Sequence, residues 1–226
     1  MKRKVVYDFL IPLFILGCLT MVFWLTDVDI ALQKAFYSPD KGWYLRDSNP
    51  WKLLYNYGNI PGIFLAAASL IVLALSFTYS KALRYRKIAL FLVVLLALGP
   101  GLITYSIFKD HWGRPRPGQL EIFGGKDTFL PVWVRGGLGR GKSFPSGHAS
   151  IGFYLFAPFF FLRRSAKGWA AFFLALGIGY GMFMGIGRMV QGGHFASDVV
   201  WAGGLTYLTG LLLFYILRFD RGIWWP

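Results

Sequence analysis

The sequence predicts an all-α integral membrane protein, built as a bundle of six transmembrane helices. Hydrophobic residues make up 56% of the 226 residues, and the mean hydropathy is +0.51. Charged residues make up only 15%, against about a quarter in a typical soluble protein, and they lie between long apolar runs. Most of the surface of such a chain faces lipid. The length suits one membrane domain over residues 1–226, without a separate soluble module.

Six apolar runs come close to the roughly 20 residues that an α-helix needs to cross the hydrocarbon core. We expect the spans at about 9–26, 60–79, 88–108, 147–162, 169–187 and 196–217. The fourth run is short and contains Pro158, so its limits are the least defined. The first run lacks a small-residue cleavage site and is expected to be an uncleaved anchor. It contains the single cysteine, Cys18, which we expect to be a small buried residue.

Basic residues predict the orientation, because short cytoplasmic segments are enriched in Lys and Arg. The following residues should therefore be cytoplasmic: Lys2, Arg3, Lys4, Lys81, Arg84, Arg86, Lys87, Arg163, Arg164, Lys167, Arg218 and Arg221. The opposite side carries the other half of the 24 basic residues. Seven of these lie in one long outer loop, about 109–146, and long loops weigh little in the rule. Both termini are therefore expected in the cytoplasm.

The residues between the first two spans, about 27–59, form an outer segment that is rich in aromatic side chains. Trp43, Tyr44, Trp51, Tyr55 and Tyr57 are typical of a stretch at the level of lipid headgroups. The net charge of the chain is +14. In a membrane protein this favours anionic headgroups and phosphate esters as partners, and we expect no binding of nucleic acid.

Three polar clusters fall on one side of the membrane in this topology. The first, 109–117, follows the third span; the second, 143–148, precedes the fourth; and the third, 188–198, joins the fifth and sixth. They contain all three histidines of the chain, His111, His148 and His194. Randomly placed polar residues would not select one membrane face three times. We therefore expect an active site at the outer face.

The residue types in these clusters suit the binding of a phosphoryl group. Lys109, Arg116 and Arg188 are cations for phosphate oxygens, and the arginines can bind as bidentate forks. Ser146 and Gly147 stand where a helix should begin, so unpaired N–H groups there favour an anion. Gly147 would allow the backbone to approach the phosphate closely. Together these groups would neutralise charge in a phosphoryl-transfer transition state.

The histidines and one carboxylate supply the remaining chemistry. His194 and Asp198 are four residues apart and share one face if the sixth helix begins near 194. The carboxylate would hold the imidazole in one tautomer and leave its other nitrogen free to attack phosphorus. His148 would protonate the leaving oxygen and then activate water. We expect neither a metal nor a cofactor, because neighbouring arginines and lysines would repel a metal cation.

These residues resemble the three signature motifs of the type 2 phosphatidic acid phosphatase superfamily. The first is Lys109, six residues, then Arg116-Pro117, and the second is Pro145-Ser146-Gly147-His148. In the third, five residues separate Arg188 from His194, and three separate His194 from Asp198. The motifs span residues 109–198, and the six-span layout extends the likeness to the whole chain.

The resemblance implies a lipid phosphatase with His194 as nucleophile, Asp198 as its partner and His148 as the acid. It implies that phosphate is bound by Lys109, Arg116, Ser146, Gly147 and Arg188. One departure is Gly187, since the family often has serine before the third-motif arginine. Within the superfamily, the chain is most similar to bacterial lipid A phosphatases, and a lipid A 1-phosphatase-like activity is expected. This branch implies a Gram-negative inner membrane with the site facing the periplasm.

Several other functions remain open at this point. The same residues would serve a phosphatidylglycerophosphate phosphatase, an undecaprenyl pyrophosphate phosphatase, or a transferase that moves phosphate between lipids. A catalytically silent lipid-binding protein is the alternative outside enzymes, although such proteins commonly lose a nucleophile, an acid or a cation. A transporter is disfavoured because the ionisable residues gather at one face rather than at the midplane.

The other conspicuous residues have structural interpretations. His111 is expected to be a hydrogen-bonded structural residue, and Arg114 is left open between an anchor and a ligand. Interfacial anchoring is expected for Lys126, Arg135, Arg140 and Lys142. The glycine runs at 177–181 and 185–187 predict helix packing. The aromatic stretch Phe156–Phe161 is expected to face lipid.

Overall fold

A computed structural model describes residues 2–137 and 139–221, and within these the fold is helical, with isolated β-bridges at Ser38–Gly42 and Leu120–Asp127. Five helical stretches of the described chain are long and apolar enough to cross a membrane. They are Val5–Leu25, Trp51–Leu75, Arg86–Lys109, Lys167–Val190 and Ala196–Ile216. A shorter apolar helix, Gly147–Leu162, takes the place of the predicted fourth span. The chain is therefore a multi-pass helical membrane protein.

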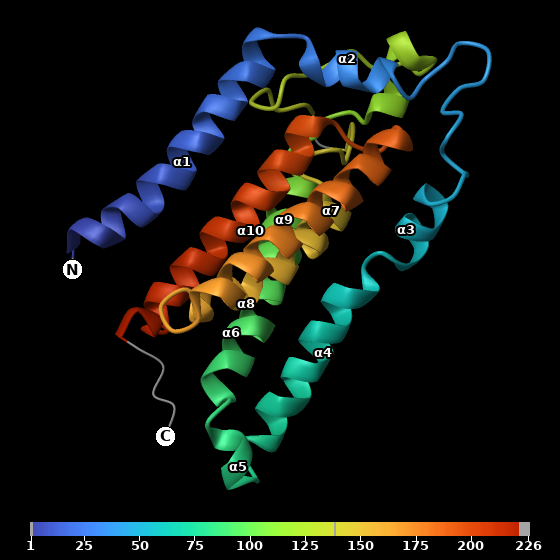
Figure 1. Ribbon diagram of the computed structural model, residues 1–226. Helices are drawn as coiled ribbons and strands as arrows, with labels where there is room; N and C mark the ends of the chain where they lie inside the picture. Colours follow the sequence, from blue (N-terminus) through green and yellow to red (C-terminus); the bar gives the residue numbers. More distant parts are fainter. Residues whose placement is uncertain (1, 138, 222–226) are drawn as a thin grey trace.

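Helix α1 (Lys2–Leu25) lies at the side of the bundle against α10 (Ala196–Ile216), as Figure 1 shows. Trp201 on α10 donates a hydrogen bond to Thr20 over 3.1 Å. Most of the α1 surface is nevertheless exposed, and 72% of Phe14 is accessible. Cys18 is also exposed, so the expectation that it is buried is wrong. The reason is that only one narrow face of α1 meets the bundle.

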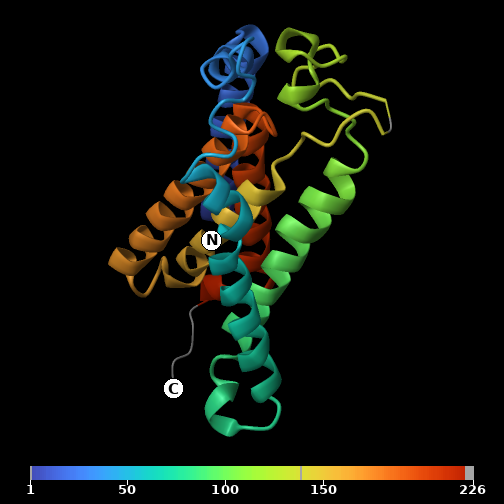
Figure 2. The same ribbon diagram turned by 90° about the vertical axis from the view of Figure 1, so that its right-hand side faces the viewer.

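The second stretch consists of α3 (Trp51–Tyr57) and α4 (Ile60–Leu75), which follow each other across a short break. Figure 2 shows this stretch crossing between α9 on one side and the α6–η1 helix on the other. The helix therefore begins nine residues before the predicted limit of 60, within the outer segment. A short helix, α5 (Ser80–Leu83), follows and leads to α6 (Arg86–Leu96).

Helix α6 continues as a π-helix, η1 (Ala97–Lys109), where the sequence predicted one regular helix over 88–108. Pro100 lies near the start of η1. In an α-helix, its ring would clash with the carbonyl four residues earlier and one hydrogen bond would be lost. The wider π register begins at this point and carries the chain to Lys109, at the edge of the polar clusters.

The helix in the fourth position is composed of α7 (Gly147–Phe153), η4 (Tyr154–Phe156) and α8 (Ala157–Leu162). It lies in the centre of the bundle, packed on α9 (Lys167–Val190) and α10. Phe156 and Phe160 are almost fully buried, at 2% and 0% exposure, so the expectation that this stretch faces lipid is wrong. Glycines make this burial possible, because a Cβ on Gly177 would collide with the Phe156 backbone and one on Gly210 with the Phe160 ring.

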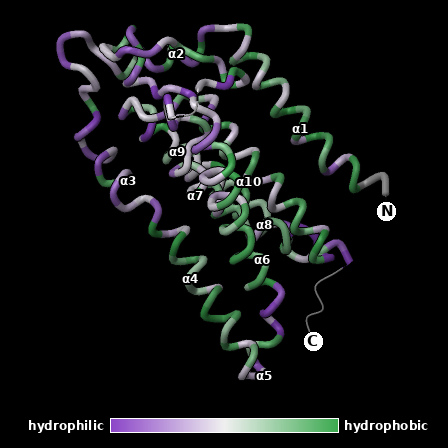
Figure 3. Tube along the Cα trace, turned by 180° about the vertical axis from the view of Figure 1, so that it is seen from behind, coloured by the Kyte–Doolittle hydropathy of each residue, from purple (hydrophilic) through white to green (hydrophobic). Residues whose placement is uncertain are grey.

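The polar segments gather at one end of the molecule, as the hydropathy colours of Figure 3 show. This end holds α2 (Val28–Lys34) and the loop with η2 (Pro117–Gln119) and η3 (Glu121–Phe123). The loop has a small core of its own, formed by Leu120, Phe123 and Phe195, with Trp43 packed against it. Helices α5 and η5 (Phe219–Arg221) lie toward the other end of the bundle. The loop core ties the outer segment to the start of α10.

Candidate active site

His194 lies in the short connection between α9 and α10 and is only 1% exposed. Its Nδ1 atom is 2.5 Å from the carbonyl oxygen of Ser143. Because a carbonyl oxygen only accepts hydrogen bonds, the ring carries its proton on Nδ1. Nε2 is then left with its lone pair, which is the state that a nucleophilic imidazole requires.

Asp198, in the first turn of α10, lies beside this ring and is fully buried. Its Oδ2 atom is 3.7 Å from Nδ1 of His194 and accepts shorter hydrogen bonds from the Ser143 hydroxyl (2.6 Å) and the Phe195 amide (2.8 Å). The i,i+4 spacing in the sequence predicts that the carboxylate itself holds the ring. In the structure, Nδ1 of the ring donates its short hydrogen bond to the Ser143 carbonyl. The negative charge of Asp198 acts on the ring from 3.7 Å away.

Burial governs the protonation of His194. Desolvation lowers the pKa of the imidazole to about 3, although Asp198 acts in the opposite direction by stabilising the charged form. The positive charge of Lys109 lowers the pKa further. The ring is therefore neutral at neutral pH.

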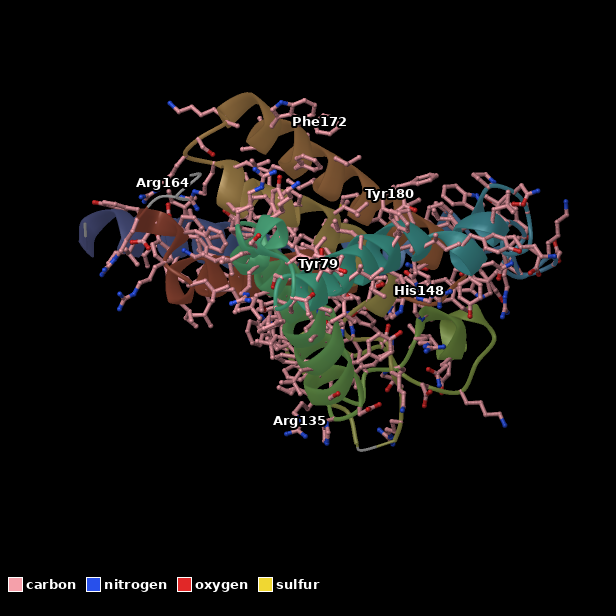
Figure 4. All side chains as sticks on the ribbon, turned by 90° about the horizontal axis from the view of Figure 1, so that it is seen from below. Tyr79, Arg135, His148, Arg164, Phe172 and Tyr180 are labelled. Atoms are coloured by element: carbon pink, nitrogen blue, oxygen red, sulfur yellow. The ribbon has the colours of Figure 1, made fainter. Side chains whose placement is uncertain are left out.

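His148 is the second residue of α7, and its ring stacks on Tyr55 with a centroid distance of 5.1 Å. The guanidinium of Arg188 lies over the same Tyr55 ring, 4.6 Å from its centroid. In Figure 4, His148 lies next to the α3–α4 stretch, whereas Arg135 and Arg164 lie at distant edges of the molecule. Tyr55 therefore links the predicted acid to a predicted phosphate ligand. The sequence alone indicates only that Tyr55 lies at the headgroup level.

The three predicted phosphate-binding cations come from three segments and meet at this end of the bundle. Lys109 ends η1, Arg116 precedes η2, and Arg188 lies in the last turn of α9. Lys109 and Arg188 are only 8% and 9% exposed. The charge of Lys109 interacts with those of Arg116 and Arg188, and all three act on His148. Buried charges of one sign are costly unless an anion pairs with them.

Arg188 has an unused donor in this arrangement. Its guanidinium donates to Gln191, but among the described residues its buried Nε atom has no hydrogen-bond partner. A buried donor without a partner destabilises the protein by its full desolvation free energy, because no hydrogen bond replaces the lost hydration. A phosphate oxygen would supply the missing acceptor and also balance the charge.

Ser146 and Gly147 stand at the start of α7, inside the same cluster. The Ser146 hydroxyl accepts from the Ala149 amide over 3.5 Å, as an N-cap, and the Ser146 amide donates to the Asp198 carbonyl over 3.2 Å. A Cβ on Gly147 would lie 2.5 Å from the Tyr105 ring. Glycine at 147 is therefore required by Tyr105 packing, in addition to any approach of a phosphate.

A polar cavity of about 380 Å³ opens beside these residues. Arg116 and Arg188 line it, together with Tyr55, which contacts His148. The other lining residues are Trp43, Arg46, Asp47, Lys52, Asn56, Gly118, Gln119, Gln191, Gly192 and Gly193. The outer segment thus forms one wall of the cavity and the motif residues form the other.

Arg114 is the residue whose importance the sequence left undecided. It is 0% exposed, and its Nη1 atom donates to Asp198 Oδ1 over 2.5 Å. Its Nη2 atom donates to Asp29 on α2 over 2.9 Å. The guanidinium also stacks on Phe195, 4.4 Å from the ring centroid. Arg114 is therefore a bridge between two buried carboxylates and does not anchor the protein at the membrane surface.

Asp29 belongs to the site although none of the sequence motifs includes it. It is 1% exposed and accepts hydrogen bonds from the amide (2.9 Å) and the hydroxyl of Ser197. One turn later on α2, Gln33 donates to the His194 carbonyl over 2.9 Å. Burial raises the pKa of Asp29, and the charge of Arg114 opposes this effect. Helix α2 thus holds the segment that carries His194 and Asp198. The available signal was an acidic residue between two apolar neighbours, Val28 and Ile30, in the outer segment.

His111 lies outside this cluster. Its Nδ1 atom is 3.0 Å from the Ser106 carbonyl and 3.1 Å from the Ile107 carbonyl, so it caps the end of η1 as a structural residue. In the outer loop, Lys142 pairs with Asp110 at 2.7 Å and both are exposed. Within the described residues, no three His, Cys, Asp or Glu side chains converge as metal ligands would.

Comparison with known proteins adds a family to this geometry. The profile of the PAP2 superfamily matches residues 87–221, which include all three motifs. The chain belongs to the PAP2 superfamily. It is accordingly a phosphatase, within the hydrolases.

Three curated relatives of this chain carry the name lipid A 4'-phosphatase. The protein of Francisella tularensis subsp. novicida (strain U112) is 39% identical over 158 residues, which are 70% of this chain and 70% of the relative. The protein of Rhizobium leguminosarum is 35% identical over 135 residues, 58% of this chain and 56% of the relative. The Rhizobium etli protein is 36% identical over 135 residues, 58% and 51%. No solved structure matches the chain.

The departure of this PAP2 chain at Gly187 has a structural explanation. A Cβ at this position would lie 2.9 Å from Cδ2 of Leu54, on α3. Serine at 187 would therefore require Leu54 to move. Glycine allows α3 to pack closely against the end of α9 that carries Arg188. This packing places the Tyr55 ring of α3 against the Arg188 guanidinium.

Proposed function

We propose that this PAP2 protein hydrolyses a phosphate monoester of a membrane lipid through a phosphohistidine at His194. One observation supports the proposal: the charges of Lys109 and Arg188, from two separate segments, act on a buried, neutral imidazole with a free Nε2. Both of these charges also interact with that of Arg116, from a third segment. A phosphoryl group bound by these cations would face the free nitrogen of the ring.

The reaction has two steps. In the first, the lone pair of Nε2 attacks phosphorus, the bond from phosphorus to the lipid oxygen breaks, and His148 gives its proton to that oxygen. In the second, His148 takes a proton from water, the resulting hydroxide attacks phosphorus, and the phosphorus–nitrogen bond breaks to release inorganic phosphate. Asp198 stabilises the positive charge that develops on His194. The negative charge on the oxygens of the transferred phosphoryl group is stabilised by Lys109, Arg116, Ser146, Gly147 and Arg188.

We propose lipid A as the substrate and its 4'-phosphate as the group removed. The family resemblance of the sequence implies a 1-phosphatase-like activity. The relatives named as lipid A 4'-phosphatases, at 35–39% identity, favour the 4'-position instead. Phosphatidylglycerophosphate, undecaprenyl pyrophosphate and transfer to an acceptor lipid are the competing substrates and reaction.

The membrane arrangement completes the proposal. Gly147–Leu162 is the fourth of six spans, and it is short because its core position is shielded from lipid by neighbouring helices. The chain forms a single domain in a bacterial inner membrane, with both termini in the cytoplasm and the site facing the periplasm. Lys2, Arg3 and Lys4, on which part of this orientation rests, have side chains outside the described part of the structure.

The mechanism is tested with purified protein in detergent and lipid A as substrate. We expect release of inorganic phosphate, and a decrease in kcat of about 1,000-fold or more in His194→Gln, because the nucleophile is removed. His111→Gln is the matched control, since His111 is exposed and outside the cluster, and it should retain activity. Retained activity in His194→Gln, or activity abolished by a chelator, contradicts the mechanism.

The products and the substrate panel test the remaining choices. Mass balance between free phosphate and phosphorylated acceptor lipid separates hydrolysis from transfer. The 1- and 4'-monophosphates of lipid A, compared with phosphatidylglycerophosphate and undecaprenyl pyrophosphate, identify the preferred bond. A higher kcat/KM for the 4'-monophosphate than for the other three lipids supports the proposed substrate. A kcat/KM lower than that of any of the three refutes it.

A further inference from the structure

The wall of the cavity opposite the motif residues carries two cations without a role in the proposed reaction. Arg46 and Lys52 line the cavity together with one acidic residue, Asp47, and all three are exposed. Within the described residues, neither cation forms an ion pair with a carboxylate. Both therefore present unpaired positive charge to whatever occupies the cavity.

The positive charge around the site exceeds what the reacting phosphate needs. A phosphate monoester carries about −1.5 to −2 at neutral pH. Lys109, Arg116 and Arg188 already supply three positive charges for it. Arg46 adds to this excess, because its charge acts on Arg188. Like charges held close together are unfavourable, and a second bound anion would relieve the repulsion.

Packing holds the backbone that carries the two cations in position. Lys52 is in the first turn of α3, where Trp51 packs on Phe183 of α9 at a centroid distance of 5.8 Å. The Arg46 amide donates to the Trp43 carbonyl over 2.9 Å. Trp43 in turn packs so closely on Gly192 that a Cβ there would collide with its ring. The backbone that carries both cations is thus fixed against the third motif.

The position of these residues in the chain separates them from the shared machinery. The match to the PAP2 superfamily covers residues 87–221 and includes the three motifs, whereas Arg46 and Lys52 lie before it. The cavity volume, about 380 Å³, also exceeds the space that one phosphate group of five heavy atoms fills. The outer segment therefore contributes the cavity space and the positive charge that the motif residues do not account for.

We propose that Arg46 and Lys52 form a second anion subsite, which binds a negatively charged group that the lipid substrate carries in addition to the phosphate removed. The chemical class of this group is a second phosphate or a sugar carboxylate on the same lipid. The inference rests on the proposed function, because it assigns a further contact to the same substrate. Asp47 tunes the subsite by partly offsetting its charge.

The experiment compares two lipids that differ only in the second anion: lipid A 1,4'-bisphosphate and its 4'-monophosphate. The measured quantity is the ratio of kcat/KM for the bisphosphate to kcat/KM for the monophosphate. We expect wild-type protein to favour the bisphosphate, and Arg46→Gln/Lys52→Gln to lower the ratio about 10-fold, chiefly through KM for the bisphosphate. Asp47→Asn should raise the ratio, since it removes a negative charge beside the two cations.

The matched control is Lys41→Gln, which removes an exposed cation of the same segment that does not line the cavity. It should keep the wild-type ratio. A double variant with an unchanged ratio, or a Lys41→Gln effect of equal size, overturns the subsite. Restoration of monophosphate turnover by phosphatidylglycerol in the micelles would also overturn it, because the anion would then come from a neighbouring lipid. Wild-type protein that hydrolyses neither lipid refutes the proposed function instead.

Discussion

Arg114 and Asp198 form an ion pair of 2.5 Å in which neither side chain has any exposed surface. The same guanidinium pairs with Asp29 at 2.9 Å, so one positive charge serves two buried carboxylates. Buried charges are stable only when they are paired and hydrogen-bonded, and each member of this group has several partners. These three charged side chains hold the predicted catalytic segment between α2 and the outer loop. Removing one of them should have measurable consequences.

Arg114→Gln should destabilise the protein strongly. The substitution leaves Asp29 and Asp198 buried without a counter-charge, which costs about 3–5 kcal/mol when one partner of a buried pair is removed. We expect a lower thermal unfolding midpoint in detergent and loss of phosphatase activity. Arg140→Gln is the control, because Arg140 is an exposed arginine of the same loop. Equal unfolding midpoints for the two variants would show that the buried pairs contribute little.

Asp29→Asn should reduce turnover more than binding. The side chain contacts Ser197 and Arg114 but does not line the cavity, so its loss shifts the segment of His194 and Asp198 without removing a substrate contact. We expect kcat to fall about 10-fold or more, with a smaller change in KM, measured by phosphate release at varied lipid concentration. Asp27→Asn, at an exposed position two residues earlier, serves as control. A raised KM with unchanged kcat would disprove the positioning role.

The buried state of His194 predicts a pH dependence of stability. The pKa of this ring is about 3 in the folded protein and about 6.5 when exposed in the unfolded chain. Between these values the unfolded state binds more protons, so stability is present above about pH 6.5 and is lost as pH falls toward 3. Unfolding midpoints from pH 7 to pH 4 should decline less steeply in His194→Gln than in wild type. His111→Gln should follow wild type, and parallel curves for all three proteins would contradict the lowered pKa.

Two glycines of α9 should respond very differently to alanine. A Cβ on Gly177 would collide with the Phe156 backbone, whereas Gly179 has no atom within 4 Å of that position. Gly177→Ala should destabilise by about 1–3 kcal/mol through overpacking, while Gly179→Ala should be close to neutral. Thermal unfolding of both variants in one detergent makes the comparison. Similar midpoints would show that α9 can move away from the central helix at little cost.

The long spans were predictable because their apolar runs are nearly as long as a membrane is thick. The polar clusters were also expected to meet, because helix parity alone puts the ends of neighbouring spans on one side. Hydropathy does not distinguish a side chain that faces lipid from one in the centre of the bundle, since both surroundings are apolar. Phe156 and Phe160 were misassigned for this reason, and the buried position of the fourth helix depends on glycines in α9 and α10.

The partners of Arg114 could not be predicted from the sequence. Asp29 lies 85 residues before it and Asp198 lies 84 residues after it, and neither spacing follows a helical repeat. The contact depends on how the outer segment and the loop fold over the end of the bundle. The hydrogen bond from His194 to the Ser143 carbonyl depends on the same loop, whereas the sequence indicated only the i,i+4 carboxylate. Motif spacing therefore identified the reactive groups but not what orients them.

The hydrogen bonds from Ser197 to Asp29 also have a consequence for biogenesis. The two residues are 168 positions apart, so a ribosome that adds about 5–20 residues per second reaches Ser197 about 8 to 34 s after Asp29. During that interval the first helix is already in the bilayer, while the carboxylate next to it has no Ser197 to bind. The outer segment therefore acquires its final anchorage only when the last helix is inserted, and nascent chains arrested before residue 197 should expose α2 to protease.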